Sequence, residues 1–319
     1  MKVDSLPLVL ITNSVPPNSL SPLDGLAQVV MGPTGGDLMT RAEVLAHASQ
    51  LRAIINQGEL RVDEELLAAA PQLQIVANVA MGVDNLDLAM MRDRGVIATN
   101  VPDAFIESTA DCTLALLLAL SRRIPEADRF VRAAAWRSFR PGTWDGVLLR
   151  GKTLGLVGYG QIARAVETRA KAFGMKTSHF KRTGARAPGF SPLDELLGSA
   201  DFVSLHTPLN ADSHGLMNAA RIRAMKRGGF LINMARGKVV DEAALVAALQ
   251  SGHLAGAALD VFEDEPKVHP ALIRMENVVL TPHLGGGTEV SRLQARLLCA
   301  SNVAAVLRGR SPLSPVLAN

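Results

Sequence analysis

One stretch near the middle of the chain constrains the fold more than any other. The segment from Leu154 to Ala163 reads LGLVGYGQIA, with the pattern G-x-G-x-x-A directly after a short apolar run. Apolar residues spaced by three and four follow it, as in an amphipathic helix. A strand, a glycine turn and a helix in this order are typical of dinucleotide-binding sheets. The alternative is a plain glycine turn without a ligand, and the flanking strand and helix patterns count against it.

Each small residue of this pattern has its own expected task. Gly158 would allow the tight turn out of the strand, and Gly160 would let the backbone approach a pyrophosphate. Ala163 is small enough for the helix to pack against the strand, and the anion would rest on N–H groups at the helix N-terminus. The residues expected to contact the cofactor here are Gly158, Tyr159, Gly160, Gln161 and Ile162.

The composition is typical of a soluble globular protein with about two domains. Of 319 residues, 48% are hydrophobic and 20% are charged. The formal net charge is +3 and the basic residues are scattered, which argues against a nucleic-acid partner and suits a small anionic ligand. No metal ion is expected in the site.

Neither a signal peptide nor a membrane span is expected. The N-terminal apolar run from Leu8 to Ile11 is too short for a signal peptide, and the longest apolar stretch, Leu114 to Leu120, is too short to cross a membrane. The two cysteines, Cys112 and Cys299, lie in apolar helical patterns and are interpreted as buried thiols. A cytoplasmic protein is therefore expected.

Strand and helix patterns alternate twice along the chain, which favours parallel sheets with helices on both faces. Five strands are expected in the first hundred residues, at Val9–Thr12, Val29–Met31, Ala53–Asn56, Ile75–Asn78 and Val96–Thr99. Six more are expected after Gly151, at Leu154–Val157, Thr177–Phe180, Phe202–His206, Phe230–Met234, Ala257–Val261 and Val278–Thr281. A last helix spans roughly Glu289 to Leu307.

The segment between the two arrays holds a strongly apolar helix and an irregular excursion. Ser108 is the expected N-cap, with Asp111 three residues later as in a capping box. The stretch from Thr113 to Leu120 is apolar on nearly every side, so we expect this helix to be buried between two bodies. The residues from Arg129 to Asp145 include both tryptophans and show no clear period, which suggests an interface arm.

Polar residues gather where the strands of the second array end, which is the ligand-binding edge of an open parallel sheet. The tripeptide His206-Thr207-Pro208 follows its third strand, and Arg236 follows the fourth. Asp260 ends the fifth strand, Glu265 comes soon after it, and His283 follows the sixth. Each residue alone has an ordinary structural explanation, and their shared edge is what favours a functional one.

The chemistry that these side chains support is definite. Arg236 can hold a carboxylate through two parallel N–H donors, and His283 can give or take a proton near neutral pH. Glu265 can orient the imidazole and favour its charged form. With a nicotinamide opposite, these residues would form a site for the reduction of a 2-oxo acid.

The end of the second cofactor strand predicts which nicotinamide is used. An NAD-binding sheet usually places an acid there to bind the ribose 2′-hydroxyl. From Thr168 to Leu193 the chain has no Asp or Glu, and Lys181, Arg182 and Thr183 stand at the strand end, with Arg186 close behind. Arg and Thr side chains can bind a 2′-phosphate, so NADPH is expected, with NADH as the weaker alternative. The other interpretation is an exposed basic turn.

Over nearly its full length the chain resembles the D-isomer-specific 2-hydroxyacid dehydrogenases, and most of all their glyoxylate/hydroxypyruvate reductases. The matching motifs are Val157-Gly158-Tyr159-Gly160, His206-Thr207-Pro208-Leu209, Ile232 to Gly237, Leu259 to Pro266, Thr281-Pro282-His283 and, upstream, Ala80 to Asn85. Formate dehydrogenases carry Gln where Glu265 stands, and many phosphoglycerate dehydrogenases carry an extra regulatory domain, so neither is favoured.

The resemblance implies a role for each catalytic candidate. Arg236 binds the substrate's carboxylate and 2-oxo group, His283 protonates the carbonyl oxygen as hydride reaches C2, and Glu265 pairs with His283. Backbone N–H groups hold the carboxylate in a loop of the first domain, at Ala80, Met81 and Gly82. Further cofactor contacts are expected at Thr109, His206, Thr207, Pro208, Met234, Ala235, Asp260 and Gly285, with Asp260 facing the nicotinamide amide.

The resemblance also implies a fold and an assembly. It implies two doubly wound parallel-sheet domains, with a Rossmann cofactor domain at residues 102–284 inserted into a flavodoxin-like substrate domain at residues 1–101 and 285–319. A homodimer built through the cofactor domain is expected. The alternatives are a bulkier 2-oxo acid substrate, such as a phenylpyruvate or 2-ketogluconate, a dinucleotide-sensing corepressor, and a catalytically silent scaffold.

Overall fold

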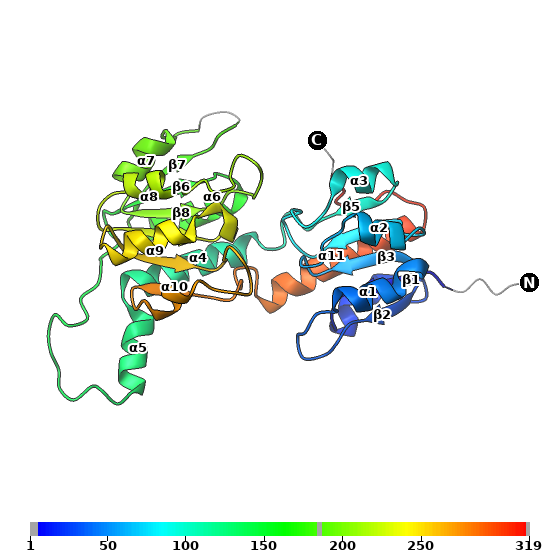
Figure 1. Cartoon of the computed structure of the whole chain (residues 1–319), viewed down its shortest axis with the longest axis horizontal. Helices are drawn as coiled ribbons and strands as arrows, with labels where there is room; N and C mark the ends of the chain where they lie inside the picture. The colour runs from blue at the N-terminus through cyan, green and yellow to red at the C-terminus, as the bar shows by residue number, and fades with distance from the viewer. Residues whose placement is uncertain (1–5, 184–186, 317–319) are drawn as a thin grey trace, which may run out of the picture. The chain divides into compact units, whose positions relative to one another are not determined.

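The structure is a computed structural model that describes residues 6–183 and 187–316. The chain divides into two compact units, of which unit 1 is Met1–Phe105 with Thr288–Asn319 and unit 2 is Ile106–Gly287. Figure 1 shows α11 (Glu289–Leu307), in orange to red, among the blue elements of unit 1. Unit 2 is thus inserted into unit 1, and the junctions lie a few residues beyond the expected ones at 101/102 and 284/285.

Unit 1 contains a parallel sheet in the order β2-β1-β3-β4-β5. Side chains alternate across it, because Val9 and Ile11 enter one core cluster and Leu10 enters the other. The strands are β1 (Leu8–Ile11), β2 (Gln28–Met31), β3 (Leu51–Asn56), β4 (Ile75–Asn78) and β5 (Ile97–Thr99). One face packs on η1 (Pro17–Leu23) and α11, and the other on α1 (Arg41–His47), α2 (Glu64–Ala69) and α3 (Leu88–Asp93), with η2 (Ala48–Gln50) leading into β3.

Unit 2 contains a second parallel sheet, in the order β11-β10-β9-β8-β6-β7. Its strands are β6 (Thr153–Val157), β7 (Lys176–Phe180), β8 (Phe202–Leu205), β9 (Gly229–Asn233), β10 (Leu254–Leu259) and β11 (Val278–Leu280). Its helices are α4 (Ile106–Ser121), α5 (Ile124–Arg132), α6 (Gln161–Ala172), α7 (Leu193–Ser199), α8 (Ala219–Ala224), α9 (Glu242–Gln250) and α10 (Pro270–Arg274), with η3 (Gly237–Val239).

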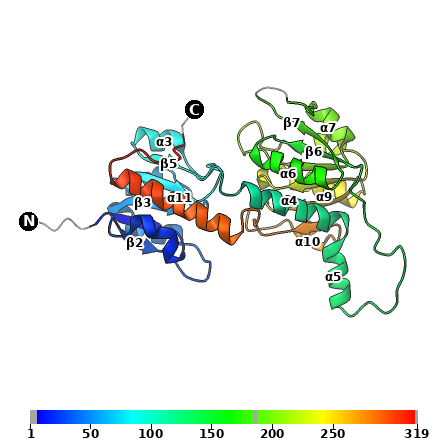
Figure 2. The ribbon, with the colours of Figure 1, turned by 180° about the vertical axis from the view of Figure 1, so that it is seen from behind.

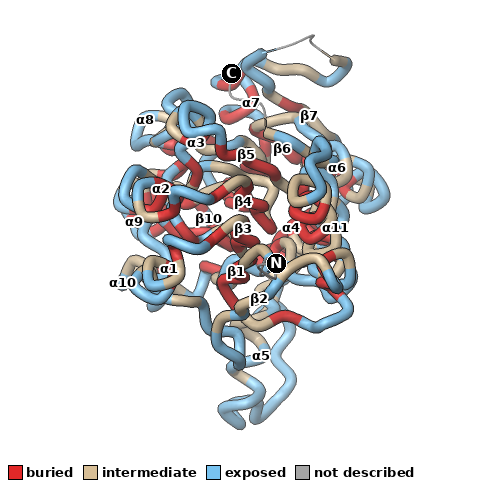
Figure 3. The backbone as a smooth tube through the Cα atoms, turned by 90° about the vertical axis from the view of Figure 1, so that its right-hand side faces the viewer, coloured by how far each residue is buried: buried red, intermediate tan, exposed pale blue. Residues whose placement is uncertain are grey.

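Helices cover both faces of the unit 2 sheet. In Figure 1 the helices α7, α8 and α9 lie in front, and in Figure 2, seen from behind, α4 and α6 lie in front. The tube in Figure 3 shows buried residues concentrated in the strands. A sheet that is buried on both sides needs near-continuous apolar strands, which explains why the strands read as apolar runs in the sequence.

The strand order of unit 2 creates a crevice at one position. From β6 the chain passes to β7 on one side, and β8 pairs with β6 on the other. The loops after β6 and β8 therefore run in opposite directions from the carboxyl ends of these two strands. Ligands bind in the crevice that forms where the strand order reverses in this way. The doubly wound α/β fold expected from the sequence is confirmed. All eleven strands form where they were expected, with ends shifted by up to three residues, and α11 has the expected bounds.

The expected start of α4 is wrong. The helix begins at Ile106, so Ser108 lies in its first turn and is buried, while Asp111 contacts Arg169 of α6 at 2.6 Å. Asp111 therefore ties two helices together and does not close a capping box. The burial of α4 is explained within unit 2, because the helix packs against α6 and strands β9, β10 and β11.

The expected irregular arm is partly helical. Residues 129–132 form the last turn of α5, and the following segment is irregular and extends away from the sheet of unit 2 (Figure 1). Trp144 packs 5.1 Å from the Phe130 ring and under the Arg123 guanidinium. Trp136 and Phe139 are instead 61% and 81% exposed. Among the described residues no helix is both long and apolar enough to cross a membrane.

One buried amide joins α11 to the C-terminal segment and gives a test of the fold of unit 1. Asn302 Oδ1 accepts hydrogen bonds from the Leu313 and Ser314 N–H groups at 2.7 and 3.2 Å, and its Nδ2 donates to Ser314 Oγ at 2.9 Å. We expect Asn302→Ala to lower the free energy of unfolding by about 1–3 kcal/mol in urea titrations, because these groups lose their partner. Ser301→Ala on the same helix is the control, and an equal loss in both variants would contradict this account.

Candidate active site

The glycine loop forms the tight turn expected of it. Gly158 has φ +89°, and a Cβ there would lie 2.6 Å from the His206 carbonyl oxygen, so only glycine fits. Its N–H donates to Phe180 O at 2.9 Å. Gly160 occupies the N-cap of α6 without a side-chain cap. Amides at such a helix start suit a phosphate, so the loop fits a dinucleotide's pyrophosphate.

The side chain of Tyr159 packs between β7 and α6. Its ring stacks on His179 of β7 with centroids 3.5 Å apart, and its hydroxyl donates to Glu167 Oε2 at 2.5 Å. Thr177 Oγ1 also donates to Glu167, at 2.7 Å. Burial and the Glu167 carboxylate raise the pKa of Tyr159 to about 12. The Tyr159 side chain therefore fixes the glycine loop to β7.

The basic turn after β7 is in the expected place and has an unexpected partner. Lys181, Arg182 and Thr183 follow directly on Phe180. Arg182 Nη1 lies 2.8 Å from Asp212 Oδ2, and both side chains are more than half exposed. Arg186 lies outside the described residues. Asp212 comes from the loop after β8, so no pattern near β7 indicated it.

His206 directly follows β8 and its backbone lies beside the glycine loop, as expected. Its Nε2 lies 2.9 Å from Ser204 Oγ, so the ring turns back over its own strand. Burial lowers the pKa of His206 to about 4, and the imidazole is therefore neutral at physiological pH. The crevice consequently carries no histidine charge at this strand, and Thr207 and Pro208 continue along the loop.

Asp260, at the end of β10, organises the loop after β11. Its Oδ1 accepts from Thr281 Oγ1 at 2.6 Å and from Leu284 N at 2.8 Å, and its Oδ2 accepts from Gly285 N at 2.8 Å. The Asp260 backbone carbonyl accepts from His283 N at 2.8 Å. Both carboxylate oxygens are thus already hydrogen-bonded within the protein. Met234, Thr109 and Gly285 gather around this carboxylate, as their assignment to one cofactor site requires.

His283 and Glu265 form the expected pair. Nδ1 of His283 lies 2.8 Å from Glu265 Oε2, and Glu265 Oε1 accepts from Phe262 N at 3.0 Å. Burial alone would raise the pKa of the Glu265 carboxyl, but His283, the Phe262 amide and the Arg236 charge together hold it below its ordinary value. The carboxylate is therefore ionised and orients the imidazole, whose side chain is half exposed.

Arg236 lies on a loop that is packed against the one carrying Glu265. A Cβ on Gly237 would lie 1.8 Å from the Phe262 carbonyl carbon, so the two backbones are in contact and only glycine fits. Arg236 Nη1 donates to Ala235 O at 2.9 Å, and Asn233 Nδ2 donates to Arg236 O at 3.0 Å. The structure thus brings Arg236, Glu265 and His283 to one edge of the unit 2 sheet.

The loop Ala80-Met81-Gly82 follows β4 in unit 1, and asparagine side chains hold its carbonyl groups. Asn100 Nδ2 donates to Met81 O at 2.8 Å, and Asn78 Nδ2 donates to Gly82 O at 2.9 Å. Because the C=O and the following N–H of a planar trans peptide point in opposite directions, the Gly82 N–H faces away from Asn100. The loop can therefore present N–H groups to an anion.

Sequence reasoning missed the residues that support the site. They are Asn78, the last residue of β4, Asn100, which directly follows β5, Glu167 on α6, and Asp212 in the loop after β8. An Asn at or just after the end of an apolar strand was the available signal for the first two, since an amide that is removed from water requires hydrogen-bonding partners. Glu167 and Asp212 contact residues 8 and 30 positions away, and no periodicity marks them.

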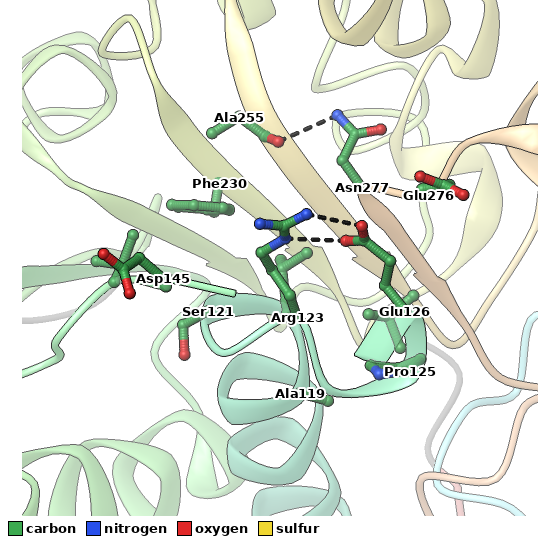
Figure 4. A pocket seen from close by; sticks show the side chains of 14 residues that line it. Ala119, Ser121, Arg123, Pro125, Glu126, Asp145, Phe230, Ala255, Glu276 and Asn277 are labelled. Carbon is green, nitrogen blue, oxygen red and sulfur yellow. Dashed lines mark hydrogen bonds and ion pairs between the residues drawn. The ribbon is translucent and has the colours of Figure 1, made fainter. Parts of the chain in front are cut away.

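A pocket of unit 2 lies away from the catalytic candidates Arg236, Glu265 and His283 (Figure 4). Its walls include Phe230 and Ala255, near the amino ends of β9 and β10. Arg123 projects into it and forms two hydrogen bonds with Glu126. Since the catalytic candidates lie at the carboxyl ends of the strands, this pocket belongs to the opposite edge of the sheet.

Comparison with known proteins identifies the family. Residues 114–285 match the model described as "D-isomer specific 2-hydroxyacid dehydrogenase, NAD binding domain". The chain belongs to this family. It is an NAD(P)-dependent oxidoreductase. The glyoxylate reductase of Thermococcus onnurineus is 41% identical to this dehydrogenase, with 98% of this chain and 96% of the relative covered. The glyoxylate reductase of Pyrococcus horikoshii is 39% identical over the same shares.

Solved structures agree with this assignment. The NADPH-dependent glyoxylate/hydroxypyruvate reductase of Sinorhizobium meliloti, in complex with NADP and malonate, matches the dehydrogenase with TM-score 0.87 and 34% identity. The match covers 98% of this chain and 97% of that one. D-lactate dehydrogenase of Aquifex aeolicus, complexed with NAD and lactic acid, matches with TM-score 0.83 and 29% identity. This match covers 95% of this chain and 96% of that one. Relatives of one fold therefore hold both nicotinamide cofactors.

The lowered pKa of Glu265 predicts how stability depends on pH. The folded pKa lies below the ordinary 4.5, so ionised Glu265 stabilises the folded dehydrogenase above that pH, and this contribution is lost as pH falls through the folded pKa. We expect the unfolding free energy of Glu265→Gln to fall less than that of the wild type between about pH 5 and pH 3, measured by urea titration at each pH. Glu289→Gln, at an exposed site on α11, should follow the wild type. A Glu265→Gln curve parallel to the wild type would contradict the pairing.

Proposed function

We propose that the protein reduces small 2-oxo acids, glyoxylate and hydroxypyruvate, to 2-hydroxy acids, with NADPH as the preferred cofactor. One observation carries this proposal: the His283–Glu265 pair shares a sheet edge with Arg236. A carboxylate-binding group and an oriented proton donor are the two groups that reduction of a 2-oxo acid requires. The names of the glyoxylate reductase relatives support the substrate class.

Each residue has one task in the proposed mechanism. The nicotinamide supplies a hydride to C2 of the substrate when it is bound. Arg236 holds the substrate's carboxylate and polarises its 2-oxo group. Nε2 of His283 donates a proton to the carbonyl oxygen as that oxygen gains charge. Glu265 binds Nδ1, so it fixes the ring and stabilises the imidazolium before the proton is given up.

Unit 1 would supply the remaining substrate contacts. We assign it as the substrate domain, with N–H groups of Ala80, Met81 and Gly82 directed to the substrate's carboxylate. The hydrogen bonds from Asn78 and Asn100 support this role, because they fix the loop before any ligand arrives. Unit 2 would be the cofactor domain, held to the dinucleotide by the glycine loop and by the backbone around His206.

The NADPH preference rests on the basic turn. Lys181 and Arg182 stand where an acid would bind the ribose of NADH, and Thr183 adds a hydroxyl donor. The reductase from Sinorhizobium meliloti is described as NADPH-dependent, which supports the same preference here. NADH is the weaker alternative.

We include a cytoplasmic homodimer in the proposal. Trp136 and Phe139 expose large aromatic surfaces on the arm after α5, and α5 buries no residue within its own chain. Aromatic side chains exposed together are typical of protein interfaces. The two free thiols, Cys112 and Cys299, agree with a reducing compartment.

A panel of rates tests the proposed activity. Glyoxylate, hydroxypyruvate, phenylpyruvate and 2-ketogluconate are each assayed with NADPH and with NADH. We expect the first two acids to give the highest kcat/KM, and NADPH to exceed NADH for each of them. Faster turnover of phenylpyruvate or 2-ketogluconate would assign a bulkier substrate, and no turnover of any 2-oxo acid would overturn the proposal.

The proton donor is tested separately. We expect His283→Ala to lower kcat by about 10²- to 10⁴-fold, the usual contribution of a general acid. NADPH affinity, measured by fluorescence titration, should change little. Glu265→Gln should lower kcat less and shift the pH–rate profile. A parallel loss of cofactor binding in His283→Ala would show that the histidine is structural.

A further inference from the structure

The expected 2′-phosphate ligand, Arg182, already has an anionic partner. Its Nη1 lies 2.8 Å from Asp212 Oδ2, in a pair whose side chains are 60% and 57% exposed. Arg182 follows β7 and Asp212 lies in the loop after β8, so the pair joins two loops that both leave the carboxyl edge of the unit 2 sheet. The sequence had suggested a basic turn with no acid, and the structure supplies the acid from elsewhere.

The loop around Asp212 is fixed by its own hydrogen bonds. Asn210 Oδ1 accepts from the N–H groups of Asp212 and Ser213 at 3.0 and 3.1 Å. Ser213 Oγ donates to Pro208 O at 2.6 Å. The acid is therefore held in place by the same loop that begins at the cofactor segment His206-Thr207-Pro208. Arg182, by contrast, has a long side chain on an exposed turn and can rotate toward a ligand.

The two nicotinamide cofactors would interact differently with this pair. The 2′-phosphate of NADPH carries about −1.5 to −2 charges and three acceptor oxygens at neutral pH. A guanidinium binds it through two parallel hydrogen bonds, and Asp212 both occupies that guanidinium and repels the phosphate. The 2′-hydroxyl of NADH is neutral and can donate a hydrogen bond to a carboxylate.

We infer that Asp212 is a specificity-determining residue that limits the preference for NADPH by competing with the 2′-phosphate for Arg182. This inference rests on the proposed use of a nicotinamide at the basic turn. Because an exposed ion pair is weak, the 2′-phosphate displaces the Asp212 carboxylate from Arg182, and the protein still binds NADPH. The residual charge of Asp212 then weakens NADPH binding and leaves NADH usable.

The test is equilibrium binding, which requires neither substrate nor turnover. Fluorescence titrations give Kd for NADPH and for NADH with the wild type and with Asp212→Asn. We expect the variant to bind NADPH about two- to fivefold more tightly, the range for an exposed charge pair. NADH affinity should stay the same or fall. Asp93→Asn is the matched control, since Asp93 is also an exposed carboxylate paired with an arginine, Arg92 at 2.8 Å, and lies in unit 1.

A double-variant cycle decides whether the effect passes through Arg182. We expect Arg182→Ala to weaken NADPH binding much more than NADH binding, and Asp212→Asn to lose most of its effect in the Arg182→Ala background. Equal shifts for both cofactors, weaker NADPH binding by Asp212→Asn, or an undiminished shift without Arg182 would overturn the inference. A wild type that binds NADH more tightly would contradict the NADPH preference proposed above, whereas the inference is decided by the Asp212→Asn shifts measured with and without Arg182.

Discussion

The carboxylate of Asp260 is the group on which the geometry of the site depends. It accepts three hydrogen bonds from the segment Thr281–Gly285, and the carbonyl of the same residue accepts a fourth from His283 N. His283 has φ 53°, a left-handed conformation that residues other than glycine rarely adopt. The hydrogen bonds to Asp260 hold the backbone in this conformation, and the imidazole therefore reaches Glu265. The buried Asp260 carboxylate, directly after β10, thus fixes the orientation of the His283 imidazole.

The fold could be predicted from the sequence because its signals are local. Apolar runs of three to six residues mark strands that are buried on both faces, and the G-x-G-x-x-A pattern marks the first strand-to-helix turn of the unit 2 sheet. The gathering of Arg236, Glu265 and His283 followed from one rule, that parallel strands end at a common edge. The start of α4 could not be predicted as well, because Ser108 has the chemistry of an N-cap and the helix nevertheless begins earlier, at Ile106.

The supporting contacts could not be predicted, because side-chain conformation and loop shape decide them. Nothing near Arg182 in the sequence indicates Asp212, since the two meet only when the loops after β7 and β8 have folded. Likewise, Tyr159 has the place of a cofactor-binding residue, yet its ring lies on His179 and its hydroxyl on Glu167. In both cases tertiary contacts that the sequence does not show determine what the side chain touches.

The contact between Gly237 and Phe262 has a consequence for how the site responds to a substrate. Because the two backbones touch, the peptide beside Arg236 cannot shift without displacing the segment that carries Glu265. A carboxylate group bound by the arginine would therefore meet a proton donor whose alignment is already set, and little rearrangement would remain between binding and reaction. Such rigidity favours a low reorganisation energy over adaptability.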